Sequence, residues 1–176
     1  EKKNIKGAEL SKKTLGIVGF GNVGVRLSNL VKGFDMKILV NSKSLESRKN
    51  EYPHVENASF DDLITKCDIL SFHCKATSDG KPMLTKDHMK QMKPTSYVIN
   101  AARGNIVDEN DLNEALNEGL IAGAAVDVFS KEPTKENVLF NNPKAILTPH
   151  IAASTTEASI VAVSYTHLTL PTTEAV

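Results

Sequence analysis

Short apolar runs recur along the chain and alternate with segments of helical pattern. The runs are mostly apolar throughout and rich in Val and Ile, which is typical of strands covered on both faces. The predicted strands are TLGIVG (14–19), MKILV (36–40), DILSFHC (68–74), SYVINA (96–101), IAGAAVDV (121–128) and AILT (145–148). Because strands and helices alternate, the pattern predicts βαβ units and a parallel sheet in an α/β fold.

Start and stop signals bound the helices between these strands. Ser59, followed by two acidic residues, predicts a capped helix that runs to about Lys66. A second helix is expected over 85–92, with its methionines filling the core. Asp108 is a suitable cap for the next helix, and Gly119 suits the left-handed position that ends it.

A glycine-rich turn follows the first predicted strand. Gly19, Gly21 and Gly24 form a G-x-G-x-x-G motif that opens the segment NVGVRLSNLVKG. The glycines allow a tight turn, a close approach of the backbone to a pyrophosphate, and close packing of helix on strand. A strand before the motif and a helix after it are the context that supports dinucleotide binding. The fold class is therefore predicted to be α/β, a Rossmann-type doubly wound parallel sheet with helices on both faces.

The end of the second strand lacks the acid that usually bonds the cofactor ribose. The position falls on Asn41 or Ser42, and Asp35 lies at the opposite end of the strand. Lys43 and Arg48 follow, and a cation beside a small polar residue suits a 2′-phosphate. Two interpretations stay open: the pocket accepts NADP, or Ser42 bonds the ribose of NAD and Lys43 is solvated.

Composition narrows the class of protein. Lys and Arg together number 21, as do Asp and Glu, so no charge excess indicates a nucleic acid or an anionic membrane. No apolar run approaches the roughly 18 residues of a membrane span, and the two cysteines have neither metal nor disulfide spacing. We expect a cytoplasmic protein without a metal site.

Three polar residues follow three later strands. Arg103, Glu132 and His150 lie just past strand ends, where an open α/β sheet forms its ligand crevice. Arg can hold a carboxylate, His can transfer a hydroxyl proton, and a carboxylate can fix the imidazole tautomer. Singly, each could be a surface or backbone-bonded residue, but together they favour catalysis of carbonyl reduction.

At these residues the chain resembles the nucleotide-binding domain of the D-isomer-specific 2-hydroxyacid dehydrogenases. The motifs are KTLGIVGFGNVG, INAARGNIVDENDLNEAL, AGAAVDVFSKEP and TPHIAAST, and the resemblance covers about residues 7–160. It implies that Arg103 binds the substrate carboxylate, that His150 is the acid/base, and that Glu132 is its partner. It implies cofactor contacts at Gly19, Gly21, Asn22, Val23, Gly24, Ser42, Lys43, Cys74, Ala101, Ala102, Asp127 and Ala153.

The resemblance implies hydride transfer between NAD or NADP and a D-2-hydroxy acid or 2-oxo acid, with 3-phosphoglycerate as one candidate substrate. A glyoxylate or hydroxypyruvate reductase that uses NADPH is a second hypothesis. An NAD(H)-sensing, corepressor-like interaction protein is a third, from another functional class. Family members are usually dimers, so a homodimer is expected, with no nucleic-acid or membrane partner.

Residues 1–163 are predicted to form the dinucleotide-binding domain. Residues 164–176 are Thr-rich, contain Pro171 and lack a helical stripe, so they are interpreted as a non-native or disordered tail. The resemblance implies a second domain that closes over the substrate and is absent here. We therefore expect the 176-residue chain to bind cofactor and to turn over little substrate.

Overall fold

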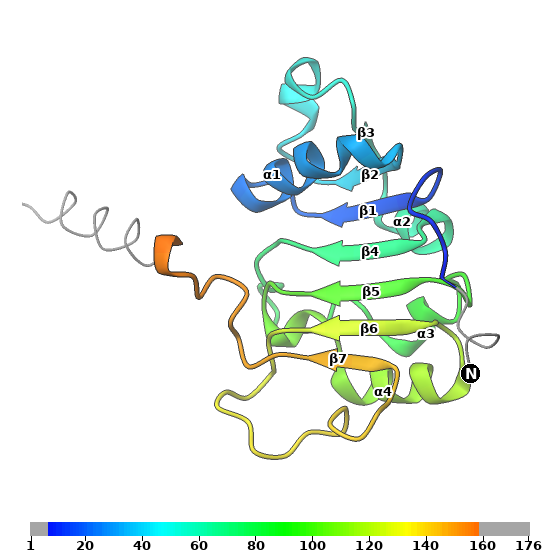
Figure 1. Ribbon diagram of the computed structural model, residues 1–176, viewed down its shortest axis with the longest axis vertical. Helices are drawn as coiled ribbons and strands as arrows, with labels where there is room; N and C mark the ends of the chain where they lie inside the picture. Colours follow the sequence, from blue (N-terminus) through cyan, green and yellow to red (C-terminus); the bar gives the residue numbers. More distant parts are fainter. Residues whose placement is uncertain (1–6, 159–176) are drawn as a thin grey trace, which may run out of the picture.

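A single parallel sheet organises the computed structural model, which describes residues 7–158 (Figure 1). Its strand order is β3-β2-β1-β4-β5-β6-β7, which confirms the predicted doubly wound parallel topology. The strands are β1 (Thr14–Val18), β2 (Lys37–Asn41), β3 (Glu56–Asn57), β4 (Ile69–Phe72), β5 (Tyr97–Asn100), β6 (Gly123–Val126) and β7 (Ala145–Leu147). All six predicted strands are present, each trimmed or shifted by one or more residues at its ends.

Helical segments connect the strands at the predicted places. They are α1 (Asn22–Leu30), α2 (Phe60–Lys66), α3 (Lys86–Met89) and α4 (Glu109–Glu118), with 3-10 turns at η2 (Val31–Phe34), η3 (Glu46–Glu51) and η4 (Gly104–Ile106). Ser59 caps α2 and Asp108 caps α4, each accepting a hydrogen bond from a backbone N–H three residues later. Gly119 ends α4 with φ of 71°, as predicted.

Helix α3 is shorter than the predicted span of 85–92. The backbone N–H groups of Gln91 and Met92 bond three residues back, so a tight turn replaces the last helical turn. Pro94 follows and disfavours helical backbone at the residue before it. Met89 and Met92 are both buried, which confirms their predicted place in the core.

Two apolar cores cover the two faces of the sheet. Neighbouring strand residues alternate between them, since Ile17 and Val40 belong to one cluster and Val18 and Leu39 to the other. Side chains of α1 pack in the first cluster, and those of α2, α3 and α4 pack in the second. The helices therefore lie on both faces, as predicted.

All strands point the same way, so their carboxyl ends form one edge of the sheet (Figure 1). Order reverses between β1 and β4, and ligands of open α/β sheets bind in the crevice at such a point. Asp35 lies at the opposite edge, where its backbone and side chain bond Lys12 and Ser11. This placement confirms that Asp35 does not replace the missing ribose-binding acid.

One strand was not predicted, and two predictions concern residues that the structure does not describe. The two-residue strand β3 was missed because it is short, polar and exposed, so no apolar pattern marks it. The predicted tail at 164–176 and the end of the predicted domain at 163 lie outside the described residues. Among residues 7–158, no helix is long and apolar enough to cross a membrane.

Candidate active site

The turn between β1 and α1 has the form that a bound pyrophosphate requires. Gly19 has φ of 92°, and a Cβ there would lie 2.6 Å from the carbonyl oxygen of His73. A Cβ at Gly24 would collide with the carbonyl group of Gly19, which explains how closely helix and strand pack. A Cβ at Gly21 would meet nothing within 4 Å. The space beside Gly21 is thus open to a ligand.

Helix α1 presents its free N-terminus to this space. Gly21 is the N-cap residue, no side chain in the described part of the chain caps the helix, and its first turn has no acidic residue. The exposed residues Asn22 and Val23 begin the helix. Unpaired N–H groups and the positive end of the helix dipole suit a phosphate. These residues therefore fit a dinucleotide.

Cys74 lies beside the same turn. A Cβ on Gly19 would lie 2.9 Å from the Cβ of Cys74, and the Cys74 thiol contacts the Met83 sulfur at 3.7 Å. Burial raises the pKa of the Cys74 thiol. Because the thiolate is the reactive form, the raised pKa makes Cys74 a poor redox group, and the residue packs beside the turn.

A pocket of about 360 Å³ lies at the end of β2, where the ribose acid is missing. Ser42 and Lys43 line it together with two carboxylates, Glu46 and Asp62. Among the described residues that line the pocket, Lys43 carries the only positive charge.

Arg48, the second cation after the end of β2, is not among the described residues that line this pocket. Its guanidinium forms an ion pair with Glu51 at 3.3 Å and stacks on the Tyr52 ring, 4.9 Å from the centroid. The η3 turn directs it there because the intervening residues wind as a 3-10 helix. It lines a different surface hollow, with Asn22 and Arg26.

The end of β5 displays Arg103 on a turn that Asn100 holds. Asn100 is 1% exposed. Its side chain accepts a hydrogen bond from the Ala102 N–H at 3.2 Å and donates one to the Arg103 carbonyl at 3.0 Å. Ala101 and Arg103 are exposed on this turn, and the Arg103 guanidinium donates to the Ala102 carbonyl at 2.6 Å.

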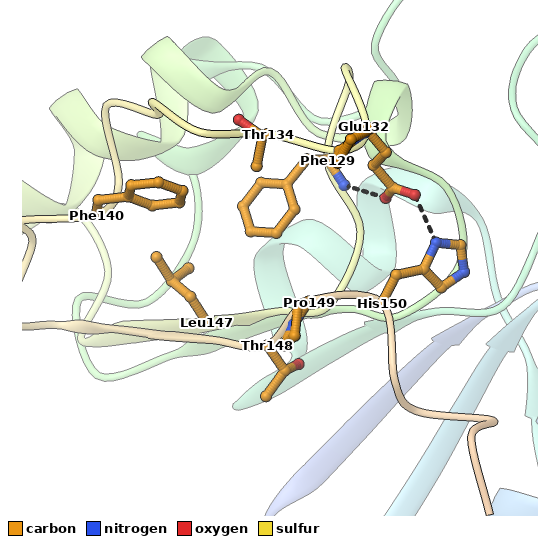
Figure 2. Close-up of a pocket in the computed structure, with 9 residues that line it drawn as sticks. Phe129, Glu132, Thr134, Phe140, Leu147, Thr148, Pro149 and His150 are labelled. Carbon is orange, nitrogen blue, oxygen red and sulfur yellow. Dashed lines mark hydrogen bonds and ion pairs between the residues drawn. The ribbon is translucent and has the colours of Figure 1, made fainter.

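Glu132 and His150 meet directly, as the prediction of a partnered imidazole requires. The Nδ1 atom of His150 lies 2.6 Å from Oε2 of Glu132, and Oε1 of Glu132 accepts from the Phe129 N–H at 2.8 Å (Figure 2). These two hydrogen bonds, with that from His150 the stronger influence, lower the pKa of the Glu132 carboxyl. The carboxylate is therefore charged at neutral pH and fixes which imidazole nitrogen it faces.

The pair borders a cavity of about 540 Å³, which is lined by the end of β7 and by residues between 129 and 140. Figure 2 shows Phe129, Phe140 and Leu147 on its apolar side and the Glu132–His150 pair at its polar end. The His150 side chain is 51% exposed, so its ring is accessible to a reactant.

Asp127 clamps the loop that carries His150. Its carboxylate accepts from the Thr148 hydroxyl at 2.6 Å and from the backbone N–H groups of Ile151 and Ala152, both at 2.9 Å. Its carbonyl accepts from the His150 N–H at 2.8 Å. Burial opposes ionisation, but these bonds outweigh it and lower the pKa of Asp127. They hold His150 at φ of 54°, a left-handed conformation that few residues other than glycine adopt.

Both carboxylate oxygens of Asp127 bond residues around His150. The predicted contact of Asp127 with a cofactor stays a prediction. Ala153 is exposed shortly beyond that loop, and its carbonyl accepts from the Thr155 N–H at 3.0 Å.

Gly104 places the Arg103 turn against the segment that leads to Glu132. A Cβ on Gly104 would overlap the peptide group between Phe129 and Ser130. The strands β5, β6 and β7 are neighbours in the sheet. Arg103, Glu132 and His150 therefore come from adjacent loops at one edge, and Glu132 and His150 are in contact.

Sequence reasoning missed two residues that build this site. Asn100 organises the Arg103 turn, and Glu109 bonds the loop that carries Glu132. An Asn at the end of an otherwise apolar strand is a usable signal, because a buried amide needs backbone partners. Glu109 had no such signal, since an acid in the first turn of a helix is common on electrostatic grounds alone.

Comparison with known proteins gives a consistent result. Residues 1–152 match the family model described as "D-isomer specific 2-hydroxyacid dehydrogenase, NAD binding domain". A glyoxylate reductase of Thermococcus litoralis is 41% identical over 152 residues, which are 86% of this chain and 46% of the relative. A D-3-phosphoglycerate dehydrogenase of Bacillus subtilis is 39% identical over 154 residues, which are 88% of this chain and 29% of the relative.

Solved structures agree on the fold. The NAD-complexed D-isomer-specific 2-hydroxyacid dehydrogenase of Lactobacillus delbrueckii ssp. bulgaricus superposes with a TM-score of 0.82 and 26% identity, over 93% of this chain and 54% of that one. This chain thus spans about half the length of that structure and half or less of the curated relatives.

Proposed function

Because this chain belongs to the D-isomer-specific 2-hydroxyacid dehydrogenase family as an NAD-binding domain, we propose that it serves an oxidoreductase. The reaction is hydride transfer between a nicotinamide cofactor and a D-2-hydroxy acid or the corresponding 2-oxo acid. The observation that carries the proposal is the 2.6 Å contact between His150 and Glu132 beside an accessible imidazole edge.

Each polar residue has a task in this reaction. With Nδ1 directed at Glu132, the other ring nitrogen of His150 is the one that exchanges a proton with the substrate hydroxyl. The charged Glu132 keeps the imidazole in that orientation and stabilises its protonated form. Arg103 binds the substrate carboxylate, for which a guanidinium has matching geometry.

The cofactor, when bound, supplies or accepts the hydride. The open space at Gly21 and the free N-terminus of α1 would hold its pyrophosphate, which is consistent with the absence of a capping side chain on this helix among the described residues. Cys74, Ala101, Ala102 and Ala153 are proposed to line its path along the carboxyl edge of the sheet. Residues 1–163 are proposed to form this one domain.

Hydride transfer needs a site shielded from water, whereas Arg103 and His150 are exposed here. The proposal therefore predicts that the 176-residue chain binds NADH but reduces 2-oxo acids slowly. Turnover is to be measured on the complete polypeptide in which this domain occurs. Glyoxylate, hydroxypyruvate and 3-phosphoglycerate, with the cofactor in the matching redox state, are the substrates to compare.

A histidine substitution tests the proposal. In the complete polypeptide, His150→Gln is expected to lower kcat by about 10²- to 10⁴-fold, the usual contribution of a general acid or base. NADH affinity should be unchanged in the same variant. His88→Gln is the matched control, because His88 bonds Thr85 at the start of α3 and lies outside the site. Retention of full turnover by His150→Gln would refute the assignment, and a wild-type protein that binds NADH without any turnover would favour a corepressor-like role.

We also propose that NAD is preferred over NADP. A 2′-phosphate at the end of β2 would meet Lys43 but also the carboxylate of Glu46. Asp62 is paired with Lys66 at 2.5 Å, and Arg48 is paired with Glu51. Affinities of the chain for NADH and NADPH test this preference. Lys43→Asp should increase the ratio of NADH affinity to NADPH affinity by about fivefold, since an exposed ion pair between Lys43 and a 2′-phosphate contributes roughly 1 kcal/mol or less. Glu46→Lys, which replaces an acid by a cation beside the same pocket, should decrease this ratio. Tighter binding of NADPH by the wild type would refute the preference.

The remaining proposals concern the complete protein. It is proposed to be a cytoplasmic homodimer without nucleic-acid or membrane partners, which is consistent with equal numbers of acidic and basic residues. Light scattering of the complete polypeptide tests the oligomeric state.

A further inference from the structure

The loop that carries Glu132 is held by a residue that no part of the proposed reaction uses. Glu109, the first residue of α4, has a half-buried side chain that points at this loop. Its Oε1 accepts from the Ser130 N–H at 2.6 Å, and its Oε2 accepts from the Asn137 side-chain amide at 2.7 Å. The two partners lie on either side of Glu132 in the sequence. One carboxylate therefore fastens both ends of the segment.

The attachment point is close to the catalytic carboxylate. Phe129 and Ser130 donate successive N–H groups, the first to Glu132 at 2.8 Å and the second to Glu109 at 2.6 Å. Gly104 packs against the peptide group that joins them. The orientation of this dipeptide thus sets the direction from which Glu132 approaches His150.

Other contacts keep the loop on the protein independently of Glu109. Leu139 is fully buried, and Asn142 donates to the side chains of Asn113 and Asn117 at 2.8 and 3.2 Å. Loss of Glu109 should therefore release the part near Glu132 and leave the later part of the loop in place.

We propose that Glu109 is a positioning residue, which bridges Ser130 and Asn137 so that Oε2 of Glu132 meets Nδ1 of His150. The catalytic consequence rests on the function proposed above. The geometric consequence, an intact Glu132–His150 contact, does not depend on that function.

A double-mutant cycle tests the catalytic consequence in the complete polypeptide. Glu109→Ala should lower kcat about tenfold and alter the pH dependence of kcat/KM, with little change in KM for NADH. In the Glu132→Gln background the same substitution should have almost no further effect, because Glu109 acts through Glu132. An equal loss in both backgrounds would overturn the proposal.

Two further variants separate positioning from folding. Glu114→Ala is the matched control on the same helix, since Glu114 bonds Lys86 at 2.8 Å and does not touch the loop. Glu109→Gln keeps an oxygen for the Ser130 N–H and should recover most of the activity. If Glu109→Ala does not fold, Glu109→Asp carries the test, because it keeps the charge but is one methylene too short to reach both Ser130 and Asn137. A pH profile of Glu109→Asp identical to the wild type then counts against the proposal.

Carbon-13 NMR of the Glu132 carboxyl in the 176-residue chain tests the geometry without turnover. The bonds from His150 and Phe129 lower the pKa of Glu132, so Glu109→Ala should raise its titration midpoint towards the ordinary value. Removal of a nearby negative charge alone would move the midpoint in the opposite direction. An unchanged or lower midpoint refutes the positioning role. If Glu109→Ala raises the midpoint but the complete wild-type protein shows no turnover, the positioning role is supported and only the proposed function is refuted.

Discussion

Gly104 offers a sharp test of how the site is assembled, because a single methyl group there would separate two of its loops. The Cβ of alanine would lie well inside the 3.0 Å that real Cβ atoms essentially never cross, with backbone atoms of Phe129 and Ser130 as its neighbours. Backbone cannot rotate away as a side chain can, so the two segments must move apart by roughly 1 Å or more. The bond from Phe129 to Glu132 lies at this contact.

The loss of unfolding free energy in Gly104→Ala can be taken from measured overpacking of dense protein interiors. Such substitutions destabilise by about 1–3 kcal/mol, and the backbone on both sides places Gly104→Ala near 3 kcal/mol. At roughly 2–4 °C per kcal/mol for a chain of this size, Tm should fall by about 6–12 °C. Calorimetry of the 176-residue chain measures this fall.

A matched glycine gives the control for that experiment. Gly33 would place a Cβ with nothing within 4 Å, so Gly33→Ala should leave Tm unchanged or raise it slightly, as alanine restricts the unfolded chain. If Gly104→Ala and Gly33→Ala melt within about 2 °C of each other, a difference near the error of such comparisons, the close approach of the Arg103 turn to the Glu132 loop is wrong.

Three further outcomes follow from the same contacts. Gly21→Ala should weaken NADH binding with little change in Tm, because a Cβ there would point into the space proposed for the pyrophosphate. Gly24→Ala should lower Tm as well, because of these two glycines only Gly24 has backbone in the way of a Cβ. Fluorescence titration and calorimetry separate the two effects. The pKa of Asp127 is lowered in the folded protein, so its contribution to stability is present above the unfolded-state pKa of 3.8 and is lost as pH falls through the folded-state pKa. Asp127→Asn should therefore be less stable than the wild type at pH 7 and should lose less stability on acidification. Urea unfolding at several pH values measures both effects. Burial raises the pKa of Cys67 to about 12, so a thiol reagent at pH 8 should label Cys74 first and Cys67 only in denaturant, and equal labelling rates would contradict this burial.

The architecture could be predicted from the sequence because each element has a local signal. The apolar runs gave six strands of the sheet, and Ser59, Asp108 and Gly119 marked helix ends through backbone bonds that depend on near neighbours. Strand β3 gave no signal, since two exposed polar residues pair with β2 only because the chain returns there. Local chemistry therefore accounts for most of the fold, and the exceptions are set by tertiary contact.

The candidate site was predictable in its members but not in its supports. Glu132 and His150 were expected to meet because both follow strand ends, and they do. Arg48 follows the end of β2 closely in the sequence and was noted there as a nearby cation, but the winding of η3 turns it towards Tyr52. Glu109 reaches its partners 21 and 28 residues away, and no spacing rule within a helix or strand announces a bond of that range.

A common design explains why these supports matter. Asn100, Asp127 and Glu109 each bind backbone N–H groups of a loop at the carboxyl edge, whereas Arg103 and His150 are displayed outward from those loops. A backbone bond fixes the path of a turn whatever side chain the turn carries, so rigidity does not require the reactive groups to be buried. Exposed residues at this edge can therefore be held in place for a reactant and still remain accessible to it. The left-handed backbone of His150, held by Asp127, is the clearest case, because a free loop would relax out of that conformation.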